Sequence, residues 1–129
     1  DGGPEPPVGI SVPQAMYDDF VKISEPIQKI RPDYPFEVKV REPRKRPTRR
    51  GGTDASVFAI EGVPTLGFTT EDFKGYDFDY GEIWHTERDL YTKNIPEYQE
   101  HTATVTAIIA LGVANLDKQL SREGLYTEE

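Results

Sequence analysis

Three short segments in the middle of the chain carry the side chains best suited to chemistry. Residues 51–58 read Gly-Gly-Thr-Asp-Ala-Ser-Val-Phe. The two glycines free the backbone, and Thr53 or Asp54 can cap the apolar helix that follows. Residues 62–68 read Gly-Val-Pro-Thr-Leu-Gly-Phe, a turn that leads into a buried strand, and residues 84–89 read Trp-His-Thr-Glu-Arg-Asp. We expect the polar groups of these segments to meet at the edge of an α/β sheet.

His85 is the sharpest chemical candidate, because a neutral imidazole is a good zinc ligand and Asp89 could orient it. The alternative is a purely structural histidine, and this alternative is stronger for His101, which lies inside a helical segment. Asp54 is explained equally well as support for a site and as a helix cap. Ser56 lies in no nucleophile motif, and the sequence has no dinucleotide or phosphate-loop fingerprint. Taken singly, these residues leave the activity open.

Length and composition favour one small domain. The chain has 129 residues and a mass of 14.6 kDa, enough for a self-stabilising core. It has no cysteine, which excludes disulfides and thiolate chemistry. The longest apolar stretch, residues 107–114, is too short to span a bilayer, so no membrane span is expected. The chain begins at Asp1 without a methionine, and we expect it to be cut from a longer protein.

The charge is strongly acidic with one basic exception. A net charge of −8 argues against a nucleic-acid partner. Residues 41–50 hold six of the fifteen lysines and arginines. This segment is either a patch for anions or a solvated loop broken by prolines, and the loop is the favoured interpretation. No aromatic residues alternate with its arginines, so it offers nothing for bases to stack on.

The N-terminal third predicts a loop and a helix. Residues 1–10 are rich in proline and glycine and are expected to form a loop, within which residues 8–11 form a short strand or an extended link. Ser11 is expected to cap a helix. Pro26 is expected to kink or divide that helix near Ser24. A second helical turn would then run to Ile30.

The middle of the chain predicts short elements and long loops. Residues 36–40 alternate apolar and charged side chains, which indicates an edge strand. A basic loop over residues 41–52 leads to a helix over residues 53–61 and a strand over residues 65–69. Residues 70–94 are rich in acids and aromatics without clear periodicity, which favours a functional or lid-like loop.

A long helix closes the chain. Asn94 is expected to cap it, with Pro96 in the first turn and Glu97 completing the capping pattern, and it should end near Leu120. The tail after Ser121 is expected to be frayed. The small residues of the helix suggest close packing against a sheet. They are Ala103, Ala107, Ala110, Gly112 and Ala114.

The order and spacing of the three segments and the closing helix, over about residues 51–120, resemble the C-terminal part of the co-catalytic zinc exopeptidases. That family includes secreted leucine-type aminopeptidases, plasma glutamate carboxypeptidases and the non-catalytic transferrin receptors. The resemblance implies the C-terminal portion of a three-layer α/β/α fold. We therefore expect residues 1–129 to be a single, partial peptidase domain with a sheet of about three strands and a long C-terminal helix.

The resemblance also implies roles for individual residues. His85 matches the family's last zinc ligand, the histidine of His-Thr-x-x-Asp, and Asp1 resembles an aspartate that ligates zinc after an earlier strand. Asp54 matches the aspartate of the family's Gly-Ser/Thr-Asp motif, and Asp89 matches the aspartate after the ligand histidine. The residues expected to support the site are Asp54, Asp89, Trp84, Gly51, Gly52 and Tyr80.

This sequence departs from the family pattern in several places. Ala55 stands where many members have histidine, and Leu90 replaces the usual threonine or serine. Trp84 stands where some members have a tyrosine that stabilises the oxyanion, which leaves Tyr80 as the substitute. The family's first histidine ligand, its bridging aspartate and its upstream Glu-Glu pair, which supplies the general base and a further ligand, are not in this chain. No catalytic residue is therefore expected here.

In the implied mechanism two zinc ions activate a bridging water and polarise the scissile carbonyl, while a glutamate accepts the proton. The chain alone is expected to be inactive, and its full-length parent is most simply an aminopeptidase that acts on peptides. The alternatives are a non-catalytic interaction domain, as in the transferrin receptors, and an anion-binding module built on Arg44 to Arg50. The upstream part of the same polypeptide is the expected partner, with self-association through an exposed sheet edge as another. By resemblance, the location is extracytoplasmic.

Overall fold

The computed structural model describes residues 3–77 and 79–127. Within these residues a three-stranded sheet has the order β2-β1-β3, formed by β1 (Pro7–Val12), β2 (Glu37–Val40) and β3 (Phe68–Thr70). β1 runs parallel to β2 and antiparallel to β3. The predicted α/β class and the sheet of about three strands are confirmed.

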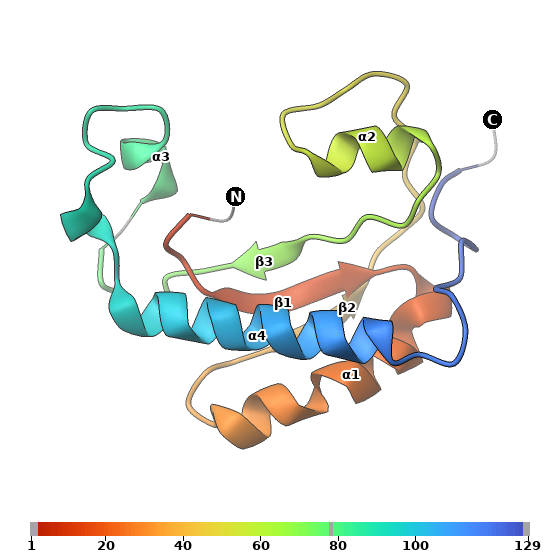
Figure 1. Ribbon diagram of the computed structural model, residues 1–129, viewed down its shortest axis with the longest axis horizontal. Coiled ribbons are helices and arrows are strands. Elements are labelled where there is room, and N and C mark those ends of the chain that lie inside the picture. Colours follow the sequence, from red (N-terminus) through yellow and green to blue (C-terminus); the bar gives the residue numbers. More distant parts are fainter. Residues whose placement is uncertain (1–2, 78, 128–129) are drawn as a thin grey trace.

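Helices connect and follow the strands. The parallel strands β1 and β2 are joined by a crossover connection that contains α1, as parallel strands require. The α-helices are α1 (Tyr17–Ile30), α2 (Ala55–Ile60), α3 (Tyr80–Ile83) and α4 (Pro96–Ala114), and the short 3-10 helices are η1 (Gln14–Met16) and η2 (Tyr91–Lys93). In Figure 1, α1 and α4 lie together on the lower side of the sheet, whereas α2 and α3 lie above it. The long C-terminal helix expected from the sequence is therefore present.

The core forms where β1 meets α1 and α4. Alternate residues of a strand face the same side, so Ile10 and Val12 point into one apolar cluster. Burying each such side chain contributes about 1.5–3 kcal/mol relative to leaving it exposed. The other members of the cluster come from helices and from the C-terminal tail: Met16, Phe20, Ile27, Val105, Ile109 and Leu125.

The N-terminal prediction is confirmed in part. The short strand expected over residues 8–11 is present within β1, but β1 begins at Pro7, in the segment expected to be loop, and is the central strand of the sheet. Ser11 is not a helix cap but a strand residue opposite Lys39. Pro7 is tolerated because it occupies the first strand position. Gly9 permits the tight pairing with β2, since a Cβ atom there would lie 2.5 Å from the carbonyl oxygen of Glu37.

Pro26 does not divide the first helix, because α1 is continuous from Tyr17 to Ile30. Phe20, Ser24 and Ile27 are buried on one face, and α1 packs along α4. This packing outweighs the loss of one backbone hydrogen bond at the proline.

The ends and the small residues of the last helix also differ from expectation. α4 begins after Ile95 without a side-chain cap and stops at Ala114, six residues before Leu120. Asn94 donates instead to the Gln99 side chain, with Nδ2 and Oε1 2.7 Å apart. The four alanines expected to face the sheet are exposed. Gly112 contacts α1 rather than the sheet, since a Cβ atom there would lie 2.4 Å from Cγ2 of Ile23.

The tail after Ser121 is not frayed over its described residues. Leu125 is buried in the core, and the backbone around it pairs with Arg44. The amide of Arg44 donates to the carbonyl of Leu125 at 3.3 Å, and the amide of Thr127 donates to the carbonyl of Arg44 at 3.0 Å. The buried Leu125 side chain and these backbone hydrogen bonds together hold the tail against the basic loop.

The remaining predictions hold in outline. β2 is an edge strand, as its alternation indicates. The helix over residues 53–61 is present as α2, and the strand over residues 65–69 begins three residues later than expected. The loop over residues 70–94 contains α3 and η2. Among residues 3–77 and 79–127, no helix is both long and apolar enough to cross a membrane.

Candidate functional site

An open pocket of about 870 Å³ lies where four separate segments meet. Gly3 and Pro4 contribute from the start of the chain, Gly52 and Thr53 from the turn before α2, and Gln99 and Thr102 from α4. The wall between them is built by α3, η2 and the turns beside them. The volume lies in the range of about 300–1,000 Å³ that is typical of ligand sites in proteins. We call this space the His85 pocket.

Five of the residues expected at a site line this pocket together: Gly52, Tyr80, Trp84, His85 and Asp89. Gly51 lies on a neighbouring pocket, and Asp54 lines neither of the two. Asp1 lies outside the described residues. Gly3, two residues later in the sequence, does line the His85 pocket.

The backbone at His85 is unusual for a residue with a side chain. His85 has φ 56°, in the left-handed region. It directly follows Trp84, which caps the C-terminal end of α3. The Trp84 ring stacks on the imidazole, with centroids 4.2 Å apart and planes at 22°. Tyr80 also stacks with Trp84, with ring centroids 6.2 Å apart and planes at 27°. Non-glycine residues with positive φ are uncommon and concentrate at functional sites.

Thr86 fastens the turn that presents His85. Its Oγ1 donates to backbone carbonyls of α3, 3.0 Å from that of Glu82 and 2.9 Å from that of Ile83. The same oxygen accepts a hydrogen bond from the amide of Arg88 at 3.2 Å. At the other end of α3, Asp79 accepts from the amide of Gly81 at 2.8 Å. A short helix held at both ends therefore carries the stacked aromatic rings.

Within the described ranges no hydrogen bond or ion pair joins Asp89 to His85, although both line the pocket. The same ranges contain no group of three or more His, Cys, Asp or Glu side chains arranged to hold a metal ion. The imidazole and the carboxylate are chemically suited to zinc, but a catalytic zinc ion usually takes three protein ligands. These residues alone therefore do not form a complete zinc site.

A polar network that sequence reasoning missed holds the loop leading into α3. Glu97, expected to cap α4, instead accepts hydrogen bonds from three side chains outside its own turn. Lys74 Nζ lies 2.8 Å and Tyr34 Oη 3.0 Å from its Oε2, and the Tyr76 hydroxyl donates to Oε1. The hydrogen bond from Lys74, followed by that from Tyr76, lowers the pKa of Glu97 to about 2.

Tyr98 extends this network beneath the same loop. Its hydroxyl donates to Oδ1 of Asp72 at 2.6 Å and accepts from the amide of Lys74 at 3.0 Å. Burial, followed by the hydrogen bond to Asp72, raises the pKa of Tyr98 to about 12. The sequence signal for this network is a cluster of tyrosines around a lysine and acidic residues. The sequence does not show which of them pair, because the partners lie far apart in the chain.

His101 is fully buried and packs on Tyr34, with ring centroids 4.0 Å apart. Neither ring nitrogen has a hydrogen bond of ordinary geometry within the described part of the chain, although the Pro7 carbonyl is near enough to favour the charged ring. Burial, with a further contribution from Arg31, lowers the pKa of His101. The structural role favoured for His101 is therefore supported, but the residue is a fully buried, neutral core residue rather than the polar or half-buried helix residue expected.

Comparisons with family models, curated proteins and solved structures find no match for this chain.

Proposed function

We propose that this chain is the C-terminal part of an α/β/α zinc exopeptidase domain whose complete form is an aminopeptidase. The observation that carries the proposal is the convergence of separate motif segments on one pocket. Gly52 comes from the Gly-Gly-Thr-Asp segment, and Trp84, His85 and Asp89 come from the segment that ends in His-Thr-x-x-Asp. This convergence is what a shared site requires, and local sequence does not impose it.

His85 is the residue proposed to bind metal. Its ring is exposed, stacked on one side by Trp84 and presented by a turn that Thr86 holds in place. Asp1 is the second proposed ligand. A bound zinc ion supplies Lewis-acid polarisation of the carbonyl and a lowered pKa of water. Asp54 and Asp89 are proposed to support the ligands rather than to bind metal.

Tyr80 is proposed to act toward the oxyanion, in place of the tyrosine that Trp84 replaces. Its ring lies against Gly3, since a Cβ atom on Gly3 would lie 2.4 Å from Cδ2 of Tyr80. Gly3 therefore leaves the ring access to the pocket. The chain offers no identified general base, so it is proposed to be inactive alone.

The upstream part of the same polypeptide is proposed to complete both the site and the sheet. β2 and β3 are the two edges of the described sheet and leave backbone groups free to pair. Further strands from upstream could pair there and supply the remaining ligands and the base. Self-association through the same edges is the competing use of this surface. An extracytoplasmic location is proposed from the resemblance alone.

A second candidate function is a non-catalytic interaction domain on the same fold, as in the transferrin receptors. The observation that favours it is the exposure of large apolar side chains around the His85 pocket. Tyr91 is 92% exposed, Leu90 57% and Trp84 54%. Exposed apolar patches mark interaction surfaces.

The deciding experiment compares this chain with the parent polypeptide that carries the upstream part. We expect the parent to bind two zinc ions, counted by native mass spectrometry, and to hydrolyse leucine p-nitroanilide, whereas the chain alone does neither. His85→Asn, which tolerates the left-handed backbone, should remove zinc and activity from the parent. The matched control Glu87→Gln, on the same turn, should leave both intact.

A parent that binds no zinc and cleaves nothing would reject the exopeptidase and leave the interaction domain. A parent that keeps its zinc and activity after His85→Asn would show that the pocket described here is not the metal site.

A further inference from the structure

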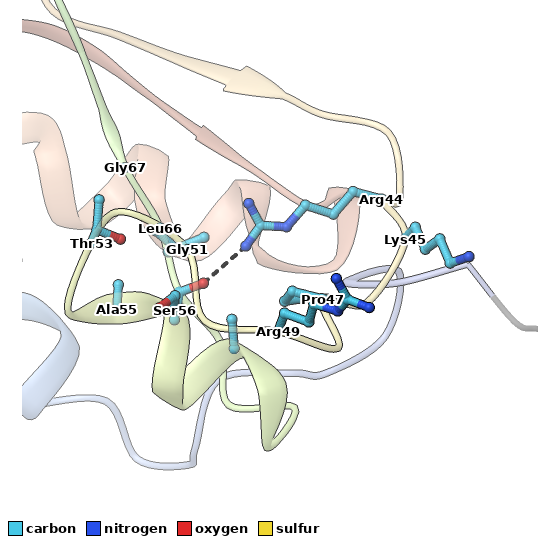
Figure 2. A pocket seen from close by; sticks show the side chains of 12 residues that line it. Arg44, Lys45, Pro47, Arg49, Gly51, Thr53, Ala55, Ser56, Leu66 and Gly67 are labelled. Carbon is cyan, nitrogen blue, oxygen red and sulfur yellow. Dashed lines mark hydrogen bonds between the residues drawn. The ribbon is translucent and has the colours of Figure 1, made fainter.

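A second pocket, of about 380 Å³, lies between the basic loop and the start of α2. Arg44, Lys45 and Arg49 line it from the loop, Thr53 from the turn before α2, Ser56 from the first turn of α2, and Thr65 from the segment before β3. Figure 2 shows these three parts of the chain around the same space. Thr53 also borders the His85 pocket, so the two pockets are neighbours. We call this space the arginine pocket.

The charge of the arginine pocket is opposite to that of the whole chain. The chain carries a net charge of −8, yet the lining residues include three cations and no aspartate or glutamate. The ion pairs found in the described ranges use Lys29, Arg31, Lys39 and Lys74, and none uses a cation of this pocket. Over residues 3–77 and 79–127, no carboxylate therefore forms an ion pair with Arg44, Lys45 or Arg49.

Arg44 is held in place on both its backbone and its side chain. Its Nη2 donates to Oγ1 of Thr65 at 2.9 Å, the interaction marked in Figure 2. Its guanidinium carbon lies 6.0 Å from the centroid of the Tyr126 ring. Its backbone pairs with the C-terminal tail through Leu125 and Thr127. A guanidinium fixed in this way loses little conformational entropy when it binds an anion.

The other cations of the loop have different surroundings. Arg46 does not line the pocket but donates from Nε to the carbonyl of Ile60 at 2.8 Å, at the end of α2. In Figure 2 the Lys45 ammonium points away from Ser56 and Thr53, so Lys45 contributes charge rather than direct contact. The loop is therefore not a uniformly solvated basic face, because Arg46 anchors it while Arg44 and Arg49 border the pocket.

We propose that the arginine pocket binds a compact multivalent oxyanion through Arg44 and Arg49, with the hydroxyls of Thr53 and Ser56 as further donors. Arginine forks match the geometry of phosphate and carboxylate oxygens, and hydroxyls add neutral hydrogen bonds. The proposal does not depend on whether the chain belongs to a peptidase. A phosphate group and a cluster of carboxylates share this chemistry, and the test separates them.

The test titrates the chain with pyrophosphate and, separately, with citrate, followed by calorimetry and by amide chemical shifts. We expect saturable binding, with the largest shifts at Thr53, Ser56 and Gly67, and weakening when salt is raised. Arg49→Ala should lower the affinity by about tenfold or more, as for hydrogen bonds to charged groups. The matched control Arg50→Ala removes a neighbouring charge that does not line the pocket and should change the affinity by less than about twofold.

Arg44→Lys supplies a second test that keeps the charge but removes the fork, and it should also weaken binding. Tighter binding of pyrophosphate would identify phosphate as the preferred group, and tighter binding of citrate would identify carboxylates. Equal losses from Arg49→Ala and Arg50→Ala would overturn the proposal, because they would show a general charge effect. Shifts spread over the whole surface, or no binding of either anion, would overturn it as well.

Discussion

Nζ of Lys74 lies 2.8 Å from Oε2 of Glu97, so the loop before α3 is tied by charge to the first turn of α4. Tyr34, in the turn after α1, donates to the same carboxylate oxygen at a distance of 3.0 Å. The hydrogen bond to Glu97 raises the pKa of Lys74, and it lowers the pKa of Glu97 to about 2. One carboxylate thus joins three parts of the chain, including the loop that leads to the His85 pocket.

Glu97→Gln should lower the free energy of unfolding at neutral pH. It should also make the free energy of unfolding depend less on pH in the acid range. The folded-state pKa of Glu97 is about 2, below the ordinary value of 4.5, so its stabilising effect is present above pH 4.5 and is lost as the pH falls from 4.5 toward 2. Urea unfolding across this range should show a smaller pH slope for the variant. The control Glu61→Gln changes an exposed carboxylate elsewhere and should keep the wild-type slope.

His101 should make folding sensitive to mild acid. Its folded-state pKa is lowered, so the unfolded chain takes up the proton first, and stability falls as the pH drops below about 6.5. Arg31 and Lys74 oppose the charged ring, and Asp33 favours it less strongly than burial opposes it. His101→Phe should remove the decline between pH 6.5 and 5 in thermal unfolding.

The control for that experiment is His85→Asn, which replaces the exposed histidine and should keep the decline. If His101→Phe retained the full pH dependence, another group would be responsible and the neutral, buried state of His101 would be refuted.

Gly9→Ala should weaken the pairing of β1 with β2. The new Cβ atom would lie 2.5 Å from the Glu37 carbonyl oxygen, and backbone cannot move away as a side chain can. We expect a loss of about 1–3 kcal/mol, the usual cost of overpacking, measured by urea unfolding. Gly67→Ala is the matched control, since a Cβ atom there has no neighbour within 4 Å, and it should change stability by less than about 0.5 kcal/mol.

Leu125→Ala should release the C-terminal tail from the core. Leu125 is 1% exposed, and truncating a buried leucine costs about 2–5 kcal/mol. Hydrogen exchange at the amides of Arg44 and Thr127 should accelerate, because their partners are carbonyls of this pairing. Leu111→Ala removes a leucine that is 64% exposed and should have little effect on either measurement. Equal destabilisation by the two changes would mean that the tail is not anchored by Leu125.

Sequence reasoning succeeded where the signal is local. The alternation of residues 36–40 indicated an edge strand, and an apolar run after two glycines indicated α2. The expected side-chain cap of α2 is not made, because Asp54 at its N-cap position forms no capping hydrogen bond. It failed where one element depends on others. β1 is packed between two strands, so it needs no alternating pattern, and Pro26 is tolerated because Phe20 and Ile27 are buried against the rest of the fold.

The candidate site shows the same division. The sequence by itself determined which residue types are available: a histidine with a neighbouring tryptophan, glycines before a short helix, and a basic loop in an acidic chain. Only the tertiary structure decided that Gly3, Gly52 and His85 border one pocket, and that Glu97 bonds Tyr34, which is 63 residues away in the chain. The physical reason is that periodicity and capping report on neighbours within a few residues, whereas burial and pairing depend on groups that folding brings together from distant parts of the sequence.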